Sequence, residues 1–308
     1  MSTTERARPS GTRPGAVKAV PVRHPGRWVA IVVIGVLVAM AVNSVVPTPS
    51  FFWPFRLEHG FSPPLPQGVA TTLWLTVVAM LMGLVLGVIL AVMRLSPNPV
   101  LTGAAWFYIW LFRGTPVYVQ LIIWATIGAL YKQVSLGIPF GEAFVTFDTR
   151  TLIPNVVAAL LGLGLNEAAY MAEIVRAGIL SVDEGQTEAA SALGMSRLLT
   201  LRRIVLPQAM RVVVPPTGNE TISMLKTTSL VVAVPYYELL FNAQAIGTRT
   251  FRPFPMLIMA SLWYLAMTSV LMIGQYYIER HYAKGSVRTL PLTPVQRLRQ
   301  RFTRSELR

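Results

Sequence analysis

A polar segment between two long apolar stretches constrains the fold of this chain more than any other feature. Residues 183–207 read DEGQTEAASALGMSRLLTLRRIVLP and carry three acidic and three basic side chains. Each charge at bilayer depth costs a few kcal/mol, so this segment must form a loop in water. Residues 186–193 are good helix formers, and Gly194 after them is a usual signal for a helix end. We therefore expect a short, exposed helix that projects from a membrane-embedded body.

The composition indicates an integral membrane protein. Of the 308 residues, 53% are hydrophobic and only 13% are charged, which is too apolar for a soluble domain. The absence of cysteine excludes disulfides, cysteine-ligated metals and thiol nucleophiles. The three histidines, His24, His59 and His281, are too scattered for a metal cluster. We therefore expect neither a metal nor another cofactor.

The first apolar segment, residues 28–46, is about long enough to span a bilayer and has Asn43 as its one strongly polar interruption. A basic stretch precedes it, so a cleaved signal peptide is the alternative. The apolar stretch is longer than a signal peptide requires, and no Ala-x-Ala site follows it. We favour an uncleaved accessory helix.

Five further apolar regions follow, which gives an all-α fold of six transmembrane helices. The second span covers about residues 68–93. The third follows the turn 94–99 and reaches Tyr131, and the fourth covers residues 152–180. The fifth starts near Gln208 and is broken around 215–229, and the sixth covers residues 255–278. Residues 68–280 are therefore expected to form the transmembrane domain.

Three other segments lie outside the expected spans. Residues 1–27 are rich in Arg, Pro, Gly, Ser and Thr and are predicted to be a disordered arm. Residues 47–67 contain repeated prolines and aromatic rings, which predicts a loop without regular helix along the outer membrane surface. Residues 281–308 form a basic tail.

The basic residues predict the orientation. If both termini are cytoplasmic, the outer loops contain only Arg56, Lys132, Arg150, Arg249 and Arg252. Short cytoplasmic loops carry an excess of Lys and Arg, so the polar loop 183–207 is expected in the cytoplasm. Attraction to anionic lipid headgroups, at about 1 kcal/mol per basic residue, explains the net charge of +14. We therefore expect membrane lipids, and not nucleic acid, as the partners of these charges.

The polar loop also carries a recognisable pattern. Glu188, Ala189 and Ala190 are followed after three residues by Gly194, and after nine more by a sequence that ends in Leu206 and Pro207. This spacing resembles the EAA loop of permease subunits in ATP-binding-cassette importers. Four further motifs resemble the polar amino acid permeases, a group that includes histidine, glutamate, glutamine, arginine and opine types: residues 112–116, 166–182, 201–211 and 218–231.

The resemblance covers about residues 71–280 and implies a type I importer core of five helices in the cytoplasmic, or inner, membrane of a prokaryote. The chain contains no G-x-x-x-x-G-K-[ST] phosphate loop, so it should not hydrolyse ATP itself. The resemblance implies two copies of a separate ATPase, a second permease copy or a paralogue, and an extracytoplasmic solute-binding protein. The expected function is transport of a polar amino acid by alternating access.

The resemblance also implies that the short helix of the loop docks into a groove of the ATPase. The alanines 189, 190 and 192 make the helix narrow, Glu188 offers an ionic contact and Gly194 permits a sharp exit. The alternative is a loop helix that is merely solvated.

Polar residues inside a span are costly, so they are candidates for the substrate path. Asn166 and Glu167 lie about midway along the fourth span, and Asn166, Tyr170 and Glu173 share one helical face. We prefer a cavity for Asn166 and Glu167, and a salt bridge with Arg176 for Glu173.

The fifth span adds Glu220, Lys226, Thr227 and Ser229 to these candidates. Lys226 with the hydroxyl donors suits the carboxylate of an amino acid, and Glu167 or Glu220 suits its ammonium group. A structural pair between Lys226 and a glutamate is equally compatible with the sequence.

Arg113 has two possible positions. If a helix starts at Pro116 with Thr115 as its N-cap, Arg113 lies at the cytoplasmic rim of the membrane. If the helix runs unbroken from Leu101, Arg113 is buried and binds an acidic partner.

A second class of function is a stand-alone secondary transporter or channel for amino acids. Such a protein is expected to show an inverted repeat, and we find none in the sequence. A membrane-anchored enzyme is disfavoured because no catalytic constellation lies outside the spans.

Overall fold

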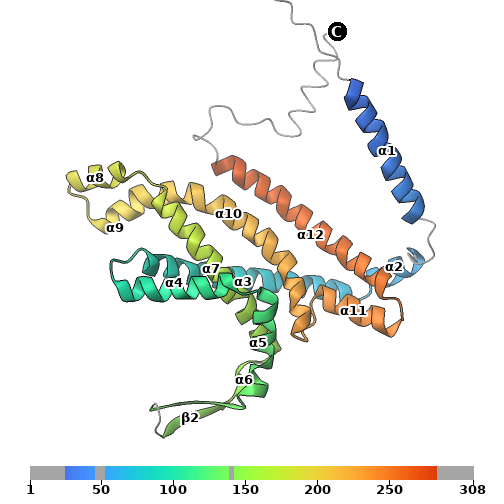
Figure 1. Cartoon of the computed structure of the whole chain (residues 1–308), viewed down its shortest axis with the longest axis horizontal. Helices are drawn as coiled ribbons and strands as arrows, with labels where there is room; N and C mark the ends of the chain where they lie inside the picture. The colour runs from blue at the N-terminus through green and yellow to red at the C-terminus, as the bar shows by residue number, and fades with distance from the viewer. Residues whose placement is uncertain (1–24, 46–52, 139–141, 283–308) are drawn as a thin grey trace, which may run out of the picture. The chain divides into compact units, whose positions relative to one another are not determined.

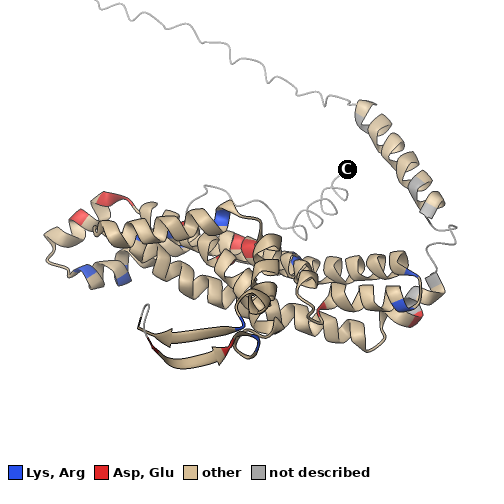
Figure 2. Ribbon diagram, turned by 60° about the horizontal axis from the view of Figure 1, so that its bottom comes forward, with Lys and Arg blue, Asp and Glu red and all other residues tan. Residues whose placement is uncertain are grey.

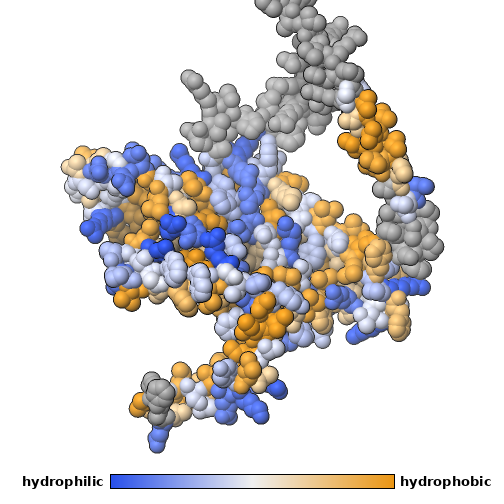
Figure 3. All heavy atoms as spheres, viewed as in Figure 1, coloured by the Kyte–Doolittle hydropathy of each residue, from blue (hydrophilic) through white to orange (hydrophobic). Residues whose placement is uncertain are grey.

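The computed structural model describes residues 25–45, 53–138 and 142–282. The chain divides into two units, Met1–Phe51 and Phe52–Arg308. The first unit contains α1 (Pro25–Val45), whose surface is mostly hydrophobic (Figure 3). This helix matches the predicted first span to within three residues. Pro25, Gly26 and Arg27 belong to α1 and not to the predicted arm, and the rest of that arm lies outside the described residues.

The second unit is an assembly of helices with one hairpin (Figure 1). Its elements in chain order are α2 (Trp53–Gly60), α3 (Pro64–Arg94), α4 (Pro99–Gly114), α5 (Val117–Leu130), β1 (Gln133–Gly137), β2 (Ala143–Asp148), α6 (Thr149–Leu152), α7 (Asn155–Leu180), α8 (Glu184–Ala192), α9 (Arg197–Thr200), the π-helix η2 (Leu201–Val205), α10 (Leu206–Thr227), the 3₁₀-helix η3 (Thr228–Ala233), α11 (Leu239–Arg249) and α12 (Pro253–Tyr282).

The helices α3 and α7 pack along each other in the middle of this unit. A Cβ atom placed on Gly87 would lie 2.5 Å from the Cβ atom of Met171, and one placed on Gly83 would lie 2.8 Å from that of Glu167. Positions four residues apart on α3 thus face positions four residues apart on α7, so the two helices run parallel. Only residues as small as glycine allow this close approach, which is the role expected of a small-xxx-small pair.

Three of the described helices are long and apolar enough to cross a membrane: α3, α7 and α12. The apolar helix α5 is shorter, with 14 residues. Charged residues lie mostly toward the two ends of the helical assembly, with an acidic group in its middle (Figure 2).

The segment 47–67 differs from the prediction in its second half. We expected the prolines to prevent regular helix, but α2 occupies Trp53–Gly60 and α3 begins at Pro64. Pro54 and Pro64 stand in the first turns of these helices, where the backbone N–H has no helical partner to lose. Phe55 is buried, and the Trp263 indole of α12 donates to the Gly60 carbonyl over 3.0 Å, so α12 holds α2 in place.

The fifth span also differs from the prediction. The helix α10 continues through Pro215, Pro216 and Gly218 and ends at Thr227, so the break begins at Thr228, where η3 starts. Prolines are tolerated in membrane helices when neighbouring helices pack around them. Here Gln275 of α12 donates its amide N–H to the Pro215 carbonyl over 2.8 Å.

The hairpin of β1 and β2 was not expected from the sequence. Val134 pairs with Phe147 and Leu136 with Val145, which places four apolar side chains on one face. All residues of both strands are exposed. The hairpin follows the end of α5 by two residues and precedes α6 and α7.

Candidate functional site

The predicted loop helix is present. It forms α8, and the Asp183 side chain caps it by accepting the Gly185 N–H over 2.9 Å. After the helix, Gly194 has a φ of +72°, in the left-handed region that the sequence predicted for a helix stop. The helix starts two residues before the predicted position 186 and ends one residue before 193. The expectation of a short helix terminated by Gly194 is confirmed.

The residues of the EAA pattern divide into two groups. Glu188, Ala189 and Gly194 are exposed, as are Leu206 and Pro207 in the first turn of α10. Ala190 is instead buried at 1% exposure, and its carbonyl accepts the Met195 N–H over 3.1 Å. The face available to a partner is therefore that of Glu188 and Ala189, whereas Ala190 packs the loop against itself.

The loop joins the two helices that carry the acidic candidates. Glu167 lies near the middle of α7, which leads into α8, and Glu220 lies in α10, which follows the loop. The two carboxylates are near enough to repel each other, and the Arg113 guanidinium attracts that of Glu220. The structure thus brings together three candidates from three different helices, α4, α7 and α10.

Glu167 is the most deeply placed of the three. Its side chain is only 4% exposed, and its Oε1 atom accepts no hydrogen bond within the described part of the chain. A buried polar atom without a partner is costly, so it normally has a reason to be kept. The Glu167 carboxyl group is therefore available to a cationic group that reaches the protein interior.

Arg113 combines features of both predicted alternatives. The helix is broken, because α4 ends at Gly114 and α5 starts at Val117, although Pro116 and not Thr115 is the N-cap residue. Its guanidinium lies 5.1 Å from the ring centroid of Tyr170, a residue of α7. Arg113 is therefore an exposed residue that lies beside α7 and near the acidic Glu220.

The other mid-span candidate, Asn166, fixes this break. Its amide nitrogen donates to the Phe112 carbonyl over 2.8 Å and to the Gln120 side chain over 3.3 Å. Gln120 in turn donates to the carbonyls of Phe112 and Thr115 and to the Thr115 hydroxyl. Sequence reasoning missed Gln120, which satisfies backbone groups that the break leaves open.

The ion pair expected between Glu173 and Arg176 is formed, with a nitrogen–oxygen distance of 2.7 Å. In this respect Glu173 plays the structural part that the sequence indicated.

The candidates at the end of α10 are arranged differently from the expectation. Lys226 is exposed and makes no ion pair or hydrogen bond through its side chain within the described ranges, so its predicted pairing with a glutamate is not seen. The Thr227 and Ser229 hydroxyls donate to the carbonyls of Ser223 and Lys226 over 3.0 and 2.7 Å. Their donors are therefore occupied in this state of the protein.

A second buried carboxylate, that of Glu238, was not identified from the sequence. It is 0% exposed and caps α11 by accepting the N–H groups of Leu240 and Phe241, and it also accepts the Tyr264 hydroxyl over 2.8 Å. The signal for it was an acidic residue directly before an apolar helix, which is an N-cap position. Its contacts make it a structural group that fixes α11 to α12.

Residues 83–284 match the family of binding-protein-dependent transport system inner membrane components. The chain belongs to this family. Its members are membrane permeases of ATP-binding-cassette transporters, so this chain is a membrane component of such a transporter and is not itself an ATPase.

Several amino acid permeases resemble the chain. The arginine transport system permease protein ArgU of Corynebacterium glutamicum is 51% identical over 91% of this chain and 88% of its own length. The nopaline transport system permease protein NocM of Agrobacterium fabrum is 36% identical over 71% and 89%. The histidine/lysine/arginine/ornithine permease protein HisM of Salmonella typhimurium is 37% identical over 66% and 83%.

Solved structures of transporters also resemble the chain. A crystal structure of an amino acid ABC transporter with histidines is 33% identical, with a TM-score of 0.61 over 72% of this chain and 95% of that chain. The MetNI methionine ABC transporter in an inward-facing conformation is 19% identical with a TM-score of 0.57, over 73% of this chain and 98% of that chain, and shows a shared fold. These findings support the permease over a stand-alone secondary transporter or channel.

Proposed function

We propose that this permease subunit carries a polar amino acid across the inner membrane, and that ATPase movements reach the substrate path through α8. The observation that carries the proposal is the position of α8 between α7 and α10. A displacement of α8 acts on α7, which holds Glu167, and through α9 and η2 on α10, which holds Glu220. Rigid helices transmit such a displacement because their backbone hydrogen bonds are internal.

The docking contact is assigned to the exposed face of α8 with Glu188 and Ala189. The left-handed Gly194 lets the chain turn after this helix, which lies at one end of the helical assembly (Figure 1). Ala190 supports the loop from inside, and Leu206 and Pro207 start the helix that receives the movement.

A cationic amino acid is the first substrate class to test. The acidic pair of Glu167 and Glu220 includes a buried Oε1 atom of Glu167 that accepts no hydrogen bond from the described residues, which favours a guest that brings a cationic donor. The relative that is 51% identical is named for arginine. Asn166, Lys226, Thr227 and Ser229 remain proposed parts of the path, with Lys226 as a cation for a substrate carboxylate.

The assembly proposed around this subunit has two ATPase copies, a second permease copy or a paralogue, and a solute-binding protein on the outer side. Both termini are proposed to be cytoplasmic. We also propose six spans, an accessory first helix at residues 28–46 and a five-helix core within residues 68–280, with the outer segment 47–67 and the basic tail 281–308 flanking it.

Purification of the tagged subunit in mild detergent, followed by mass spectrometry of copurifying proteins, tests the proposal. An ATPase with a phosphate loop is expected, and the presence or absence of a second permease distinguishes a heterodimer from a homodimer. A preparation that lacks an ATPase even after crosslinking in cells would contradict the proposal.

A further inference from the structure

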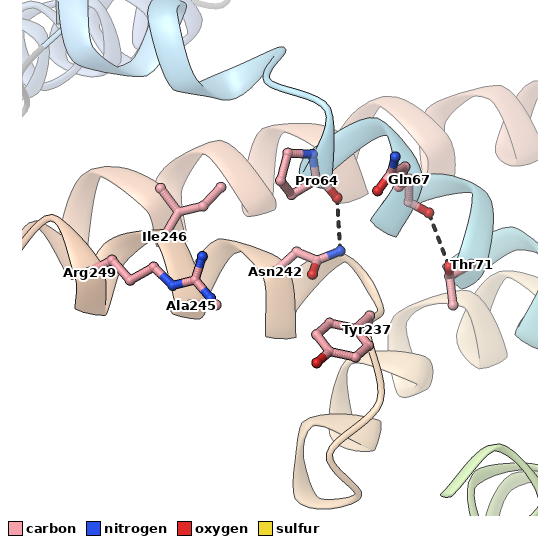
Figure 4. A pocket seen from close by; sticks show the side chains of 8 residues that line it. All are labelled: Pro64, Gln67, Thr71, Tyr237, Asn242, Ala245, Ile246 and Arg249. Carbon is pink, nitrogen blue, oxygen red and sulfur yellow. Dashed lines mark hydrogen bonds between the residues drawn. The ribbon is translucent and has the colours of Figure 1, made fainter.

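A cavity of about 420 Å³ with both polar and apolar lining residues lies between the first turns of α3 and the helix α11 (Figure 4). Its volume falls within the range of about 300–1,000 Å³ that is usual for small-molecule sites. It is lined by Pro64, Gln67, Thr71, Tyr237, Asn242, Ala245, Ile246 and Arg249.

The base of this cavity is rigid. A Cβ atom on Gly68 would lie 2.8 Å from the Cα atom of Leu239, so only glycine lets α3 and α11 approach this closely. Asn242, which is 7% exposed, donates its amide nitrogen to the Pro64 carbonyl over 2.8 Å. That bond fixes the amide group, and the Oδ1 atom of Asn242 accepts no hydrogen bond from any residue that the structure describes.

The charge of the cavity is one-sided. Arg249 is its single charged lining residue, and no carboxylate lines it. The guanidinium extends along α11 toward Asn242 (Figure 4) and makes no ion pair or hydrogen bond with the described residues. The hydroxyl of Tyr237 and the amide of Gln67 are further polar groups of the lining. Arg249 is itself exposed, and an unpaired guanidinium that lines a cavity can bind a carboxylate, because its planar fork can donate two parallel hydrogen bonds.

The cavity lies at the end of the molecule opposite to α8. The parallel helices α3 and α7 both run toward the loop that contains α8, and Pro64 is the first residue of α3. At 1.5 Å per residue, the 31 residues of α3 span about 46 Å. If α8 meets the ATPase in the cytoplasm, the cavity faces the side from which the substrate arrives.

We infer that this cavity is an outer binding site that holds an incoming amino acid by its α-carboxylate on Arg249. The Oδ1 atom of Asn242 then accepts a hydrogen bond from the α-ammonium group. The site therefore binds the two α-groups that all amino acids share and does not select the side chain. The inference rests on the proposed function, since it requires an amino acid importer with α8 in the cytoplasm.

The absence of cysteine allows a direct test. Ala245→Cys and, as a second variant, Ile246→Cys each place a single thiol in the lining of the cavity. Thr248→Cys places one on the exposed part of α11 outside the lining, as the matched control. The complete importer in membranes open on both sides is treated with small anionic and cationic thiosulfonates, and labelling of the permease subunit is measured with and without arginine or arginine amide.

Arginine at millimolar concentration is expected to slow labelling of the cavity thiols at least tenfold and to leave Thr248→Cys unaffected. Arginine amide, which lacks the carboxylate, should give no protection. The anionic reagent should react faster than the cationic one at Ala245→Cys. Arg249→Ala, combined with Ala245→Cys, should abolish both the protection by arginine and the preference for the anionic reagent. Arg249→Lys in the same background should retain this preference but weaken the protection.

Uptake by the same preparations separates the two proposals. If arginine is transported but does not protect the cavity thiols, the outer site is wrong and the proposed function stands. If a solute-binding protein without amino acid protects the thiols while arginine alone does not, the cavity is a protein contact and the inference is overturned. If no amino acid is transported by the wild-type importer, the proposed function fails first.

Discussion

Glu167 lies so close to Gly83 that a Cβ atom added to the glycine would come within 2.5 Å of the Glu167 Cγ atom. The buried carboxylate is thus held by the contact of α3 with α7. Gly83→Ala should therefore displace Glu167 or separate the helices, at a cost of about 1–3 kcal/mol of stability. Thermal unfolding of the purified subunit measures this loss of stability. Gly103→Ala is the control, since a Cβ atom on Gly103 meets nothing within 4 Å. Equal melting temperatures for the two variants would contradict this packing.

Glu167→Gln and Glu220→Gln are expected to reduce uptake of a cationic amino acid about tenfold each, which corresponds to about 1.4 kcal/mol in the transport barrier. The amide keeps the size of the side chain but removes the charge that favours a cation. Radiolabelled uptake into proteoliposomes provides the measurement. Glu58→Gln, at a residue with a 77% exposed side chain on α2, is the control. Unchanged uptake by both variants would exclude the acidic pair from the path.

Asn166 and Gln120 are expected to act as one unit at the break between α4 and α5. Each substitution by alanine should destabilise the protein by about 1–3 kcal/mol, because carbonyl groups at the break lose their donors. The double variant should cost less than the sum of the two, since Asn166 donates to the Gln120 side chain and either substitution alone already removes that bond. A thermal double-mutant cycle tests this expectation, and strict additivity would show that the two residues are independent.

Gly194 is required by its backbone and not by a contact, since a Cβ atom there would meet nothing within 4 Å. Gly194→Val should strain the left-handed turn by about 1–2 kcal/mol, whereas asparagine adopts this conformation readily. Uptake should therefore fall in Gly194→Val and remain near normal in Gly194→Asn. The same loss in both variants would indicate that the absence of a side chain, and not the turn, is essential.

The features predicted well from the sequence are those with local causes. The stop at Gly194 and the ion pair of Glu173 with Arg176 each depend on neighbouring residues, whereas the sequence left a break or an unbroken helix near Thr115 equally open. The apolar segments predicted the positions of α1, α3, α7 and α12 for the same reason, since a span needs only a sufficient run of apolar side chains.

The features that the sequence did not predict depend on contacts between distant segments. Pro215 remains within a helix because the rest of the protein, including Gln275 sixty residues later, packs around it. Arg113 lies near Glu220 because α4 and α10 both pack on α7, which no local pattern encodes. The hairpin was not predicted because its two strands are short and fully exposed, so no buried core imposes a pattern on their residues.

ATP-driven arginine uptake by Glu188→Arg tests the central claim, that α8 couples the permease to an ATPase. The substitution reverses one exposed charge on α8 and leaves the membrane helices unchanged. Uptake into proteoliposomes is predicted to fall below about one tenth of the wild-type rate, which corresponds to an increase of about 1.4 kcal/mol or more in the transport barrier. The subunit should still insert normally, and the control Glu58→Arg should transport normally. Wild-type uptake by Glu188→Arg would contradict the claim.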